Sequence, residues 1–302
     1  MFQATFIVEN MIEETYNRTV LRADGLVPPL SRWYFATAQQ RMLPSFFVIG
    51  VQKGGTTALT QYLTQHPNVI QPQRKDIYFF NNAENFAHGA EWYQAHFAHR
   101  LYKRWYELSH TVRDTITFDG TPNYFAAPGA AERLHRFFPD TKLILLLRHP
   151  AERAWSNYRM NKRHGFEQLS FEDALAAETE RITAEDAFAA KNNTHSFVRQ
   201  RLAYRTNGIY AGFLQEWLKY FDRSQLLIAT TEEMHQNTAS VYNAVTDFVG
   251  LPRFSGVNFA RFNEGGEKEK MASATREELN AFFAPHNKAL EELLSSPFNW
   301  QY

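Results

Sequence analysis

Residues 44–57 read PSFFVIGVQKGGTT, and this stretch decides the fold. The run from Pro44 to Gly50 predicts a buried strand, since a strand covered on both faces is apolar along its length. It leads into a glycine-containing turn, and Thr56–Gln65 predicts a helix that His66-Pro67 ends. A strand, a glycine turn and a helix in this order bring backbone N–H groups and a helix N-terminus together, which favours phosphate binding.

The rest of the chain alternates between strands and helices. Lys142–Leu147 (KLILLL) predicts the clearest buried strand, and shorter strands are predicted at Ile116–Asp119 and Gln225–Thr230. The predicted helices cover Val8–Leu21, Glu91–Phe97, Ala130–Phe138, Pro150–Lys162, Ser170–Ala190, Tyr210–Phe221, Val241–Val249 and Thr275–Leu294. This alternation is typical of an α/β fold with a mainly parallel sheet flanked by helices.

The domain boundary is expected near residue 43. We predict an N-terminal extension over residues 1–43, which contains a break at Pro28-Pro29, and a single α/β domain over residues 44–302. Phe46–Gly50 and Lys142–Leu147 are predicted to be neighbouring inner strands. The ligand is then expected across their carboxyl ends, as in other open α/β sheets.

The composition excludes several classes of protein. Of the 302 residues, 44% are hydrophobic and 21% charged, which is ordinary for a globular chain. Lys and Arg number 32, as do Asp and Glu, so no nucleic-acid partner is expected. Cysteine is absent, which excludes disulfides and thiolate metal sites. No apolar run reaches the roughly 20 residues of a membrane span, and the N-terminus is too acidic for a signal peptide, so we expect a cytoplasmic protein.

The phosphate loop departs from the pattern of nucleotide triphosphatases, G-x-x-x-x-G-K-[ST]. Gly50 and Gly55 have the right spacing, but Thr56 stands where the lysine is usual, and the lysine lies inside the loop as Lys53. The strand Lys142–Leu147 ends in Arg148, whereas phosphoryl-transfer enzymes place a magnesium-binding carboxylate at such a strand end. The sequence therefore predicts an anion site that needs no metal.

A second phosphate site is predicted around Arg148. Ser156 follows eight residues later on the next predicted helix, and an arginine, a helix N-terminus and a hydroxyl together can bind phosphate. The further cations nearby are Arg153, Arg159, Lys162 and Arg163, opposed only by Glu152. Two separate phosphate sites indicate a nucleotide that is phosphorylated at two positions.

These motifs resemble those of sulfotransferases that use 3′-phosphoadenylyl sulfate (PAPS), and most closely the heparan sulfate N- and 3-O-sulfotransferases. Lys53–Thr57 resembles the family's loop for the 5′-phosphosulfate, and Arg148–Tyr158 resembles its 3′-phosphate motif, R-x-P-x-x-R-x-x-S-x-Y. Three more elements are similar to K-E-x-x-F-F, G-x-x-W-Y and E-K-[ST]-P-x-Y-F. They are Lys75–Phe80, Gly89–Tyr93 and Asp119–Phe125, and Gly208–Tyr210 followed by Trp217 also fits.

The resemblance implies a soluble, bacterial-type enzyme with a P-loop-type sheet. It would transfer the sulfuryl group of PAPS to a hydroxyl or amine of a glycan, glycolipid or small natural product and release PAP, with no metal. The implied donor-binding residues are Lys53, Gly54, Gly55, Thr56, Thr57, Arg148, Ser156 and Tyr210, with Lys268 and Lys270 in the region of the family's K-G-R loop. A clean K-G-R loop and the family's late cysteine pair are both absent from the sequence.

The resemblance also implies catalytic roles. Lys53 would place positive charge on the oxygen and phosphate that leave, and a general base must take the acceptor's proton. Asp119 matches the family's carboxylate, although it is one methylene shorter than the usual Glu and could instead be a turn residue before Gly-Thr-Pro. The alternative bases are His110 and His66, because the aryl and steroid sulfotransferases use a histidine.

The acceptor site is expected to contain Lys75 and a set of aromatic rings. These rings are Trp92, Tyr93, Tyr124 and Phe125, for which core packing is the alternative interpretation. We expect a small or lightly charged acceptor rather than a heparin-like polymer, since the one other basic cluster, His99-Arg100 with Lys103-Arg104, can be a solvated face. The alternative functions are an ATP-dependent P-loop kinase and a non-catalytic nucleotide-binding protein.

Overall fold

The computed structural model describes residues 32–192, 197–259, 269–298 and 300. Its centre is a sheet of four parallel strands in the order β2-β1-β3-β4. The strands are β1 (Phe46–Gly50), β2 (Phe118–Asp119), β3 (Lys142–Leu147) and β4 (Leu226–Thr230). The predicted α/β fold is confirmed, as is the pairing of β1 with β3, in which Val48 lies opposite Ile144.

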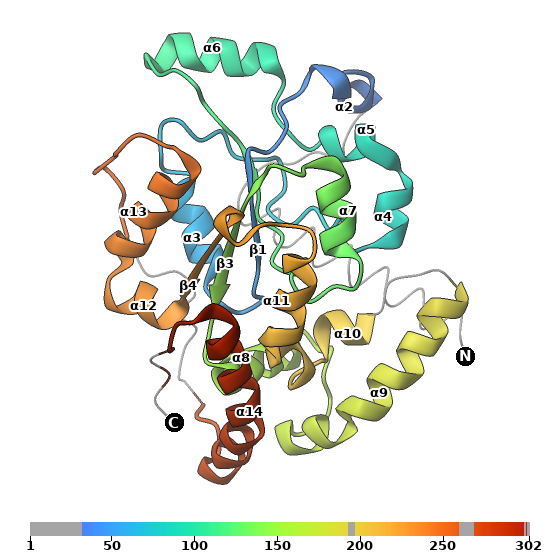
Figure 1. Cartoon of the computed structure of the whole chain (residues 1–302). Coiled ribbons are helices and arrows are strands. Elements are labelled where there is room, and N and C mark those ends of the chain that lie inside the picture. Colours follow the sequence, from blue (N-terminus) through green and yellow to red (C-terminus); the bar gives the residue numbers. More distant parts are fainter. Residues whose placement is uncertain (1–31, 193–196, 260–268, 299, 301–302) are drawn as a thin grey trace.

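Helices cover both faces of this sheet (Figure 1). The helices of the described residues, including those beyond the ends of the sheet, are α2 (Arg32–Ala36), α3 (Thr56–Leu63), α4 (Ala83–Ala87), α5 (Gly89–Gln94), α6 (Arg100–His110), α7 (Ala130–Phe137), α8 (Pro150–Arg163), α9 (Phe171–Asn192), α10 (Phe197–Arg201), α11 (Tyr210–Leu218), α12 (Thr231–Gln236), α13 (Thr238–Val249) and α14 (Ser273–Leu294). None of the helices in the described ranges is long and apolar enough to cross a membrane.

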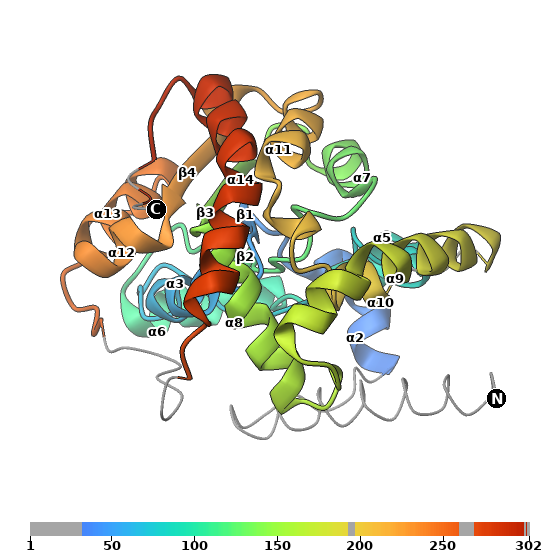
Figure 2. The same ribbon diagram turned by 90° about the horizontal axis from the view of Figure 1, so that it is seen from below.

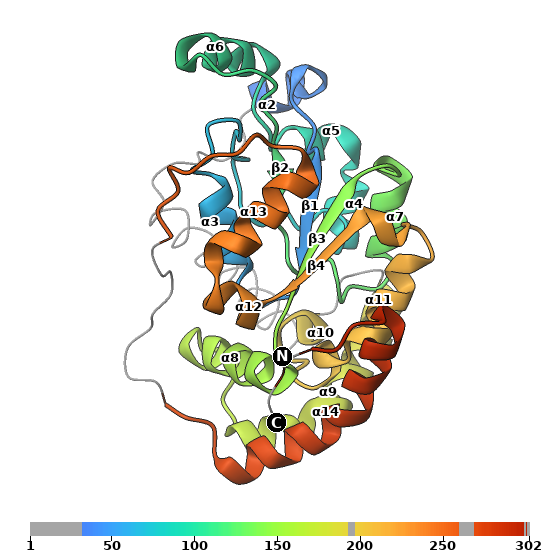
Figure 3. The ribbon, with the colours of Figure 1, turned by 60° about the vertical axis from the view of Figure 1, so that its left-hand side comes forward.

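The strand side chains alternate between two hydrophobic cores. Phe47 and Leu145 pack under α7 and α11, whereas Val48 and Ile144 pack under α3 and α13. Figure 3 shows α3, α12 and α13 on one side of the strands and α7 and α11 on the other. This alternation follows from the two-residue period of a strand, and it explains why both inner strands are apolar throughout.

A third cluster lies beyond the carboxyl ends of the strands. It joins α8 and α9 to α14 and contains Ala154, Phe171, Tyr204 and Phe283. Figure 2 shows α14 running alongside α8 and α11. These helices therefore form one wall around the edge at which the strands end, which is the edge expected to bind the ligand.

The structure differs from the predicted elements in several places, and the short helices α2, α4, α10 and α12 were not predicted. β2 is limited to Phe118–Asp119, because Ile116 makes only an isolated bridge with Val69. The helix α6 was not predicted, and its apolar side chains do not face a core. The predicted helix over Val8–Leu21 lies outside the described residues.

Candidate active site

The loop after β1 is pressed against the end of β3. The Val51 amide donates to Leu146 O at 2.9 Å, and a Cβ on Gly54 would lie only 2.4 Å from the same oxygen. Gly55 has a φ of 83° and is the N-cap of α3. Only glycine fits at position 54, and its backbone leads directly to the N-terminus of α3.

The first residue of α12 fixes the other side of this loop. The Thr231 hydroxyl lies 2.8 Å from Gly54 O and 3.0 Å from Leu147 O, so it can donate to either carbonyl. Thr231 is buried and follows β4 directly. The loop is therefore held by contacts with β3 and α12 as well as by its own glycines.

Lys53 lies in this loop with a φ of 70°, and its Nζ is 3.8 Å from Met160 Sδ. Burial, together with the positive charges of Arg148, Arg163, Lys75 and Arg159, lowers the pKa of Lys53 to about 8. A buried ammonium surrounded by four cations is unfavourable until an anion arrives. The loop therefore has the electrostatic character of an anion site.

Arg148 joins the end of β3 to the loop. Its Nη1 donates to Lys53 O at 3.1 Å, and the Tyr210 hydroxyl donates to Arg148 O at 2.8 Å. Ser156 is half-buried about two turns into α8, the helix that follows Arg148. The structure thus brings Lys53, Arg148 and Tyr210 together, with Ser156 on the adjoining helix.

Lys75 also reaches the loop, because its Nζ donates to Thr57 Oγ1 at 2.5 Å. The next residue, Asp76, has a buried Oδ1 without a hydrogen-bond partner among the described residues. Burial raises the pKa of Asp76, while the charges of Lys75 and Arg201 lower it. Asp76 was not among the predicted site residues, although its place directly after Lys75 in the K-D-x-x-F-F element was a usable signal.

Asp119 is fully buried and accepts four hydrogen bonds. Oδ1 accepts from the Thr121 amide at 3.1 Å and its hydroxyl at 2.6 Å, while Oδ2 accepts from Tyr93 at 3.0 Å and Tyr124 at 2.8 Å. Burial raises the pKa of Asp119 to about 6 against the opposing effect of these donors, and the charge of Asp76 contributes to the rise. Both carboxylate oxygens of Asp119 are therefore engaged.

The predicted acceptor-site rings have two different surroundings. Tyr93 and Tyr124 lie in the core and present their hydroxyls to Asp119, and Trp92 packs against that core. Phe125 is also buried, but it lines the pocket described below. All four rings thus pack in or against the core, as in the alternative interpretation, and Phe125 also faces the pocket.

The two histidines proposed as alternative bases lie away from the phosphate loop. Both ring nitrogens of His66 contact backbone, with Nε2 2.9 Å from Pro252 O and Nδ1 accepting from the Asn68 amide at 3.0 Å. His110 stacks on Tyr106 at the end of α6, which lies at the end of the molecule opposite α8 (Figure 1). Lys268 lies outside the described residues, and Lys270 is exposed.

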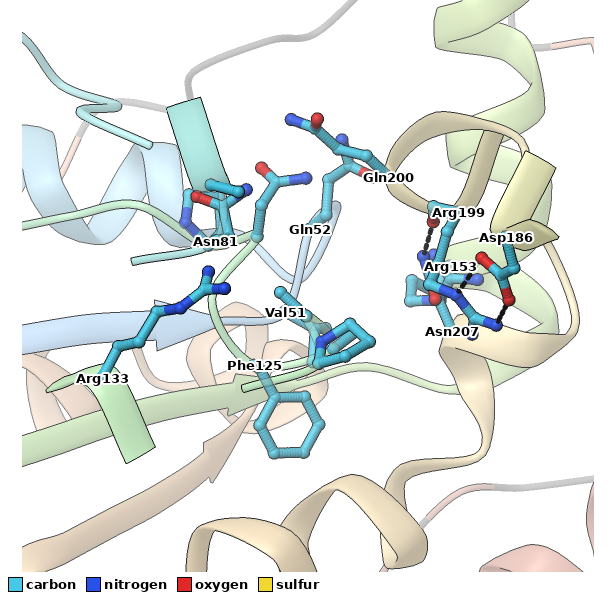
Figure 4. A pocket seen from close by; sticks show the side chains of 16 residues that line it. Val51, Gln52, Asn81, Phe125, Arg133, Arg153, Asp186, Arg199, Gln200 and Asn207 are labelled. Atoms are coloured by element: carbon cyan, nitrogen blue, oxygen red, sulfur yellow. Dashed lines mark hydrogen bonds and ion pairs between the residues drawn. The ribbon is translucent and has the colours of Figure 1, made fainter. Parts of the chain in front are cut away.

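A pocket of about 260 Å³ adjoins the phosphate loop through Val51 and Gln52. Figure 4 shows Asn81 and Arg133 on one side of it and Arg153, Arg199 and Asp186 on the other. Its lining residues are Val51, Gln52, Asn81, Ala83, Pro122, Asn123, Phe125, Ala126, Ala127, Pro128, Arg133, Arg153, Asp186, Arg199, Gln200 and Asn207. Five side-chain amides, three arginines, one aspartate and one aromatic ring give it a mixed, hydrogen-bonding surface.

Arg153 supplies the pocket with a buried guanidinium. Its Nη2 donates to Tyr204 O, whereas Nε and Nη1 have no hydrogen-bond partner in the described structure. The neighbouring Arg199 is instead paired with Asp186. Across the same described ranges, no group of three or more His, Asp or Glu side chains is arranged to hold a metal ion.

Comparisons with known proteins agree on one family. A family model described as "Sulfotransferase domain" matches residues 43–260. Heparan sulfate glucosamine 3-O-sulfotransferase 6 of Mus musculus is 29% identical over 289 residues, which covers 86% of this chain and 75% of that protein. The bifunctional heparan sulfate N-deacetylase/N-sulfotransferase 1 of Caenorhabditis briggsae is 25% identical over 90% of this chain, but the chain spans only 32% of its length.

The solved structures include a similar fold. A sulfotransferase from Alicyclobacillus acidocaldarius is 28% identical, with a TM-score of 0.64, and the match covers 85% of this chain and 97% of that one.

Proposed function

Since this chain belongs to the sulfotransferase domain family and is a PAPS-dependent sulfotransferase, we propose that its acceptor is a hydroxyl or amine on a glycan, a glycolipid or a small natural product. The main observation behind the proposed site is the cluster of cations around Lys53, because the charged form of this lysine is disfavoured there until an anion binds. The predicted boundaries, an extension over 1–43 and a catalytic domain over 44–302, stay proposals, as does the cytoplasmic location.

The residues at the sheet edge fit a nucleotide that carries two phosphates. We propose that the backbone of Gly54–Thr57 holds the 5′-phosphate at the N-terminus of α3, where Gly54 lets the loop pack directly against the end of β3. Arg148 and Ser156 would hold the 3′-phosphate, and Tyr210 would position Arg148 through its carbonyl. Lys270 and Lys268 keep their predicted role beside the nucleotide.

Lys53 is proposed to stabilise the leaving phosphate. PAPS supplies an activated sulfuryl group, and its departure leaves negative charge on a phosphate oxygen. An anion beside Lys53 raises the lysine's pKa from about 8, so the bound state keeps the ammonium charged at neutral pH. A preorganised charge of this kind acts mainly in the transition state.

Two carboxylates compete for the role of general base. Asp119 is the base that the sequence predicts, but all four of its hydrogen bonds come from protein donors. Asp76 has an unpartnered Oδ1 and a pKa raised by burial, and it follows Lys75, which contacts the phosphate loop. We therefore propose Asp76 as the base and keep Asp119 as the second candidate, because proton abstraction requires a lone pair that no protein donor occupies.

The pocket beside Gln52 is proposed to hold the acceptor. Its amides can donate and accept hydrogen bonds with hydroxyl groups, and Phe125 offers a ring face. A volume of about 260 Å³ suits one sugar ring or a similarly small group. The two relatives act on heparan sulfate by name, whereas the balanced charge of the whole chain favours a lightly charged acceptor.

Two experiments test this function. Without Mg²⁺, PAP at 100 times its Kd should stabilise the protein by about 2.7 kcal/mol in thermal unfolding, and ATP should do much less. Equal stabilisation by ATP, or a strict Mg²⁺ requirement, would favour the kinase alternative.

The acceptor is then sought by transfer of labelled sulfate from PAPS to glycans, phenols, lipid alcohols and desulfated heparosan at two salt concentrations. Transfer to a small glycan or alcohol with little salt dependence is expected. Steeply salt-dependent sulfation of heparosan would show that the acceptor is instead a polyanion held by many cations.

A further inference from the structure

The helix α6 has its apolar face turned toward solvent. Leu101, Trp105 and Leu108 are spaced three and four residues apart, so they share one face, and they are 70%, 57% and 75% exposed. The half-buried side chains on the helix are instead Lys103, Tyr106 and Glu107. This is the reverse of an ordinary surface helix, which buries its apolar stripe and exposes its charges.

Polar contacts fix the helix in this orientation. The Glu107 carboxylate accepts from the amide and the hydroxyl of buried Thr115, both at 2.8 Å, and Lys103 lies 3.6 Å from it. His99 caps the start of the helix by accepting from the Leu101 amide at 3.0 Å. The outward direction of Leu101, Trp105 and Leu108 is therefore built into the structure.

Positive charge borders the apolar face. Arg100 and Arg104 are exposed, and the one acidic residue of the helix, Glu107, is turned toward Thr115. The indole of Trp105 lies next to the Tyr102 ring, at 5.6 Å between centroids. Exposed leucines, two rings of amphipathic character and a cationic rim are the features of a helix that lies in a membrane interface.

The surface extends beyond α6. Phe35 in α2 and Leu43 before β1 are also exposed, at 38% and 45%. A bridge between Arg41 and His99 joins the segment before β1 to the start of α6, and Figure 1 shows α2 beside α6. Several apolar side chains therefore project from the same end of the molecule.

We propose that α6 docks onto the surface of an anionic lipid bilayer. Leu101, Trp105 and Leu108 enter the boundary between headgroups and acyl chains, and Arg100 and Arg104 bind lipid phosphates. A second copy of this chain is a poorer occupant, because pairing two such faces places the arginine rims against each other. Since the phosphate loop lies at the opposite end of the strands, docking leaves it open (Figure 1).

Vesicle binding by the full chain tests the proposal. In a flotation assay, the protein should float with phosphatidylcholine vesicles that contain about one third phosphatidylglycerol. Much less protein should float with vesicles of pure phosphatidylcholine. Replacing Arg100→Glu and Arg104→Glu together should weaken binding at least 25-fold, at about fivefold for each charge. A matched control, Arg136→Glu with Lys288→Glu, changes the net charge equally on α7 and α14 and should bind like the unmodified chain.

The apolar part is tested with Leu101→Ser and Leu108→Ser, which should lower vesicle affinity about tenfold or more while sulfuryl transfer in the absence of vesicles stays unchanged. Absence of binding to either vesicle type overturns the proposal. Equal loss of binding in the control variant also overturns it, because the charge effect would then be unspecific. A concentration-dependent dimer that the serine variants abolish would assign this face to a second copy instead.

Discussion

Replacing Lys53→Met should stabilise the protein when no nucleotide is bound. Methionine keeps the length and apolar stem of lysine but removes the ammonium, whose pKa burial and four neighbouring cations lower from 10.5 to about 8. When folding lowers the pKa of a lysine by one pH unit, the folded state loses about 1.4 kcal/mol of stability at any pH where the lysine stays charged. The variant should therefore gain up to about 3 kcal/mol at pH 7.

The sign of the pH dependence follows from the same lowered pKa. Between pH 8 and pH 10.5 the unfolded chain binds a proton at Lys53 that the folded chain does not, so stability rises with pH in that window. The contribution of Lys53 is fully unfavourable below pH 8 and disappears above pH 10.5. The advantage of Lys53→Met should accordingly shrink as the pH rises through this range.

Urea unfolding at pH 7 and pH 9.5, with and without PAP, measures these effects. PAP should stabilise the unmodified chain more than the Lys53→Met variant, which should also lose most of its kcat. Lys288→Met removes a largely exposed lysine and serves as the control, with no expected change. A Lys53→Met variant that is less stable than the unmodified chain at pH 7 would refute the picture of a destabilised cation cluster.

Three further predictions concern the same edge of the sheet. Asp76→Asn should lower kcat by about 10²–10⁴-fold with unchanged PAP affinity. Asp119→Asn should mainly lower the unfolding midpoint, because the new amide nitrogen cannot accept hydrogen bonds from the tyrosine or threonine donors. A large loss of kcat in Asp119→Asn and none in Asp76→Asn would make Asp119 the base. Arg148→Ala should weaken PAP binding far more than binding of adenosine 5′-phosphate in calorimetric titrations, and equal losses would exclude it as the 3′-phosphate ligand. Gly54→Ala should abolish PAP binding and lower the free energy of unfolding by about 1–3 kcal/mol, since the new methyl group would lie 2.4 Å from Leu146 O. Unchanged PAP binding would show that the loop does not hold the 5′-phosphate.

Local patterns made the sheet and the phosphate loop predictable. β3 has the predicted boundaries because KLILLL is apolar on both faces, and both of its faces are indeed buried. α3 begins at the predicted Thr56, because Gly55 can take the positive φ that its N-cap requires. Each of these features depends on neighbouring residues, which the sequence displays directly.

The features that were missed depend on contacts between distant residues. Asp76 and Asp119 each stand at the acidic position of a motif, and only the donors Tyr93, Tyr124 and Thr121 distinguish the hydrogen-bonded carboxylate from the one with an unpartnered oxygen. The outward direction of the apolar face of α6 could not be predicted either, because apolar residues at helical spacing ordinarily indicate a buried face, whereas those of α6 are exposed.

The attachment of the phosphate loop has a consequence for protein engineering. Gly54 is closed in by Leu146 O, and its own carbonyl meets the Thr231 hydroxyl, which comes 177 residues later in the chain. Grafting residues 50–57 onto another strand–helix scaffold would therefore transfer the sequence of the motif without the contacts that hold its conformation. A working graft has to include the end of β3 and the first turn of α12 as well.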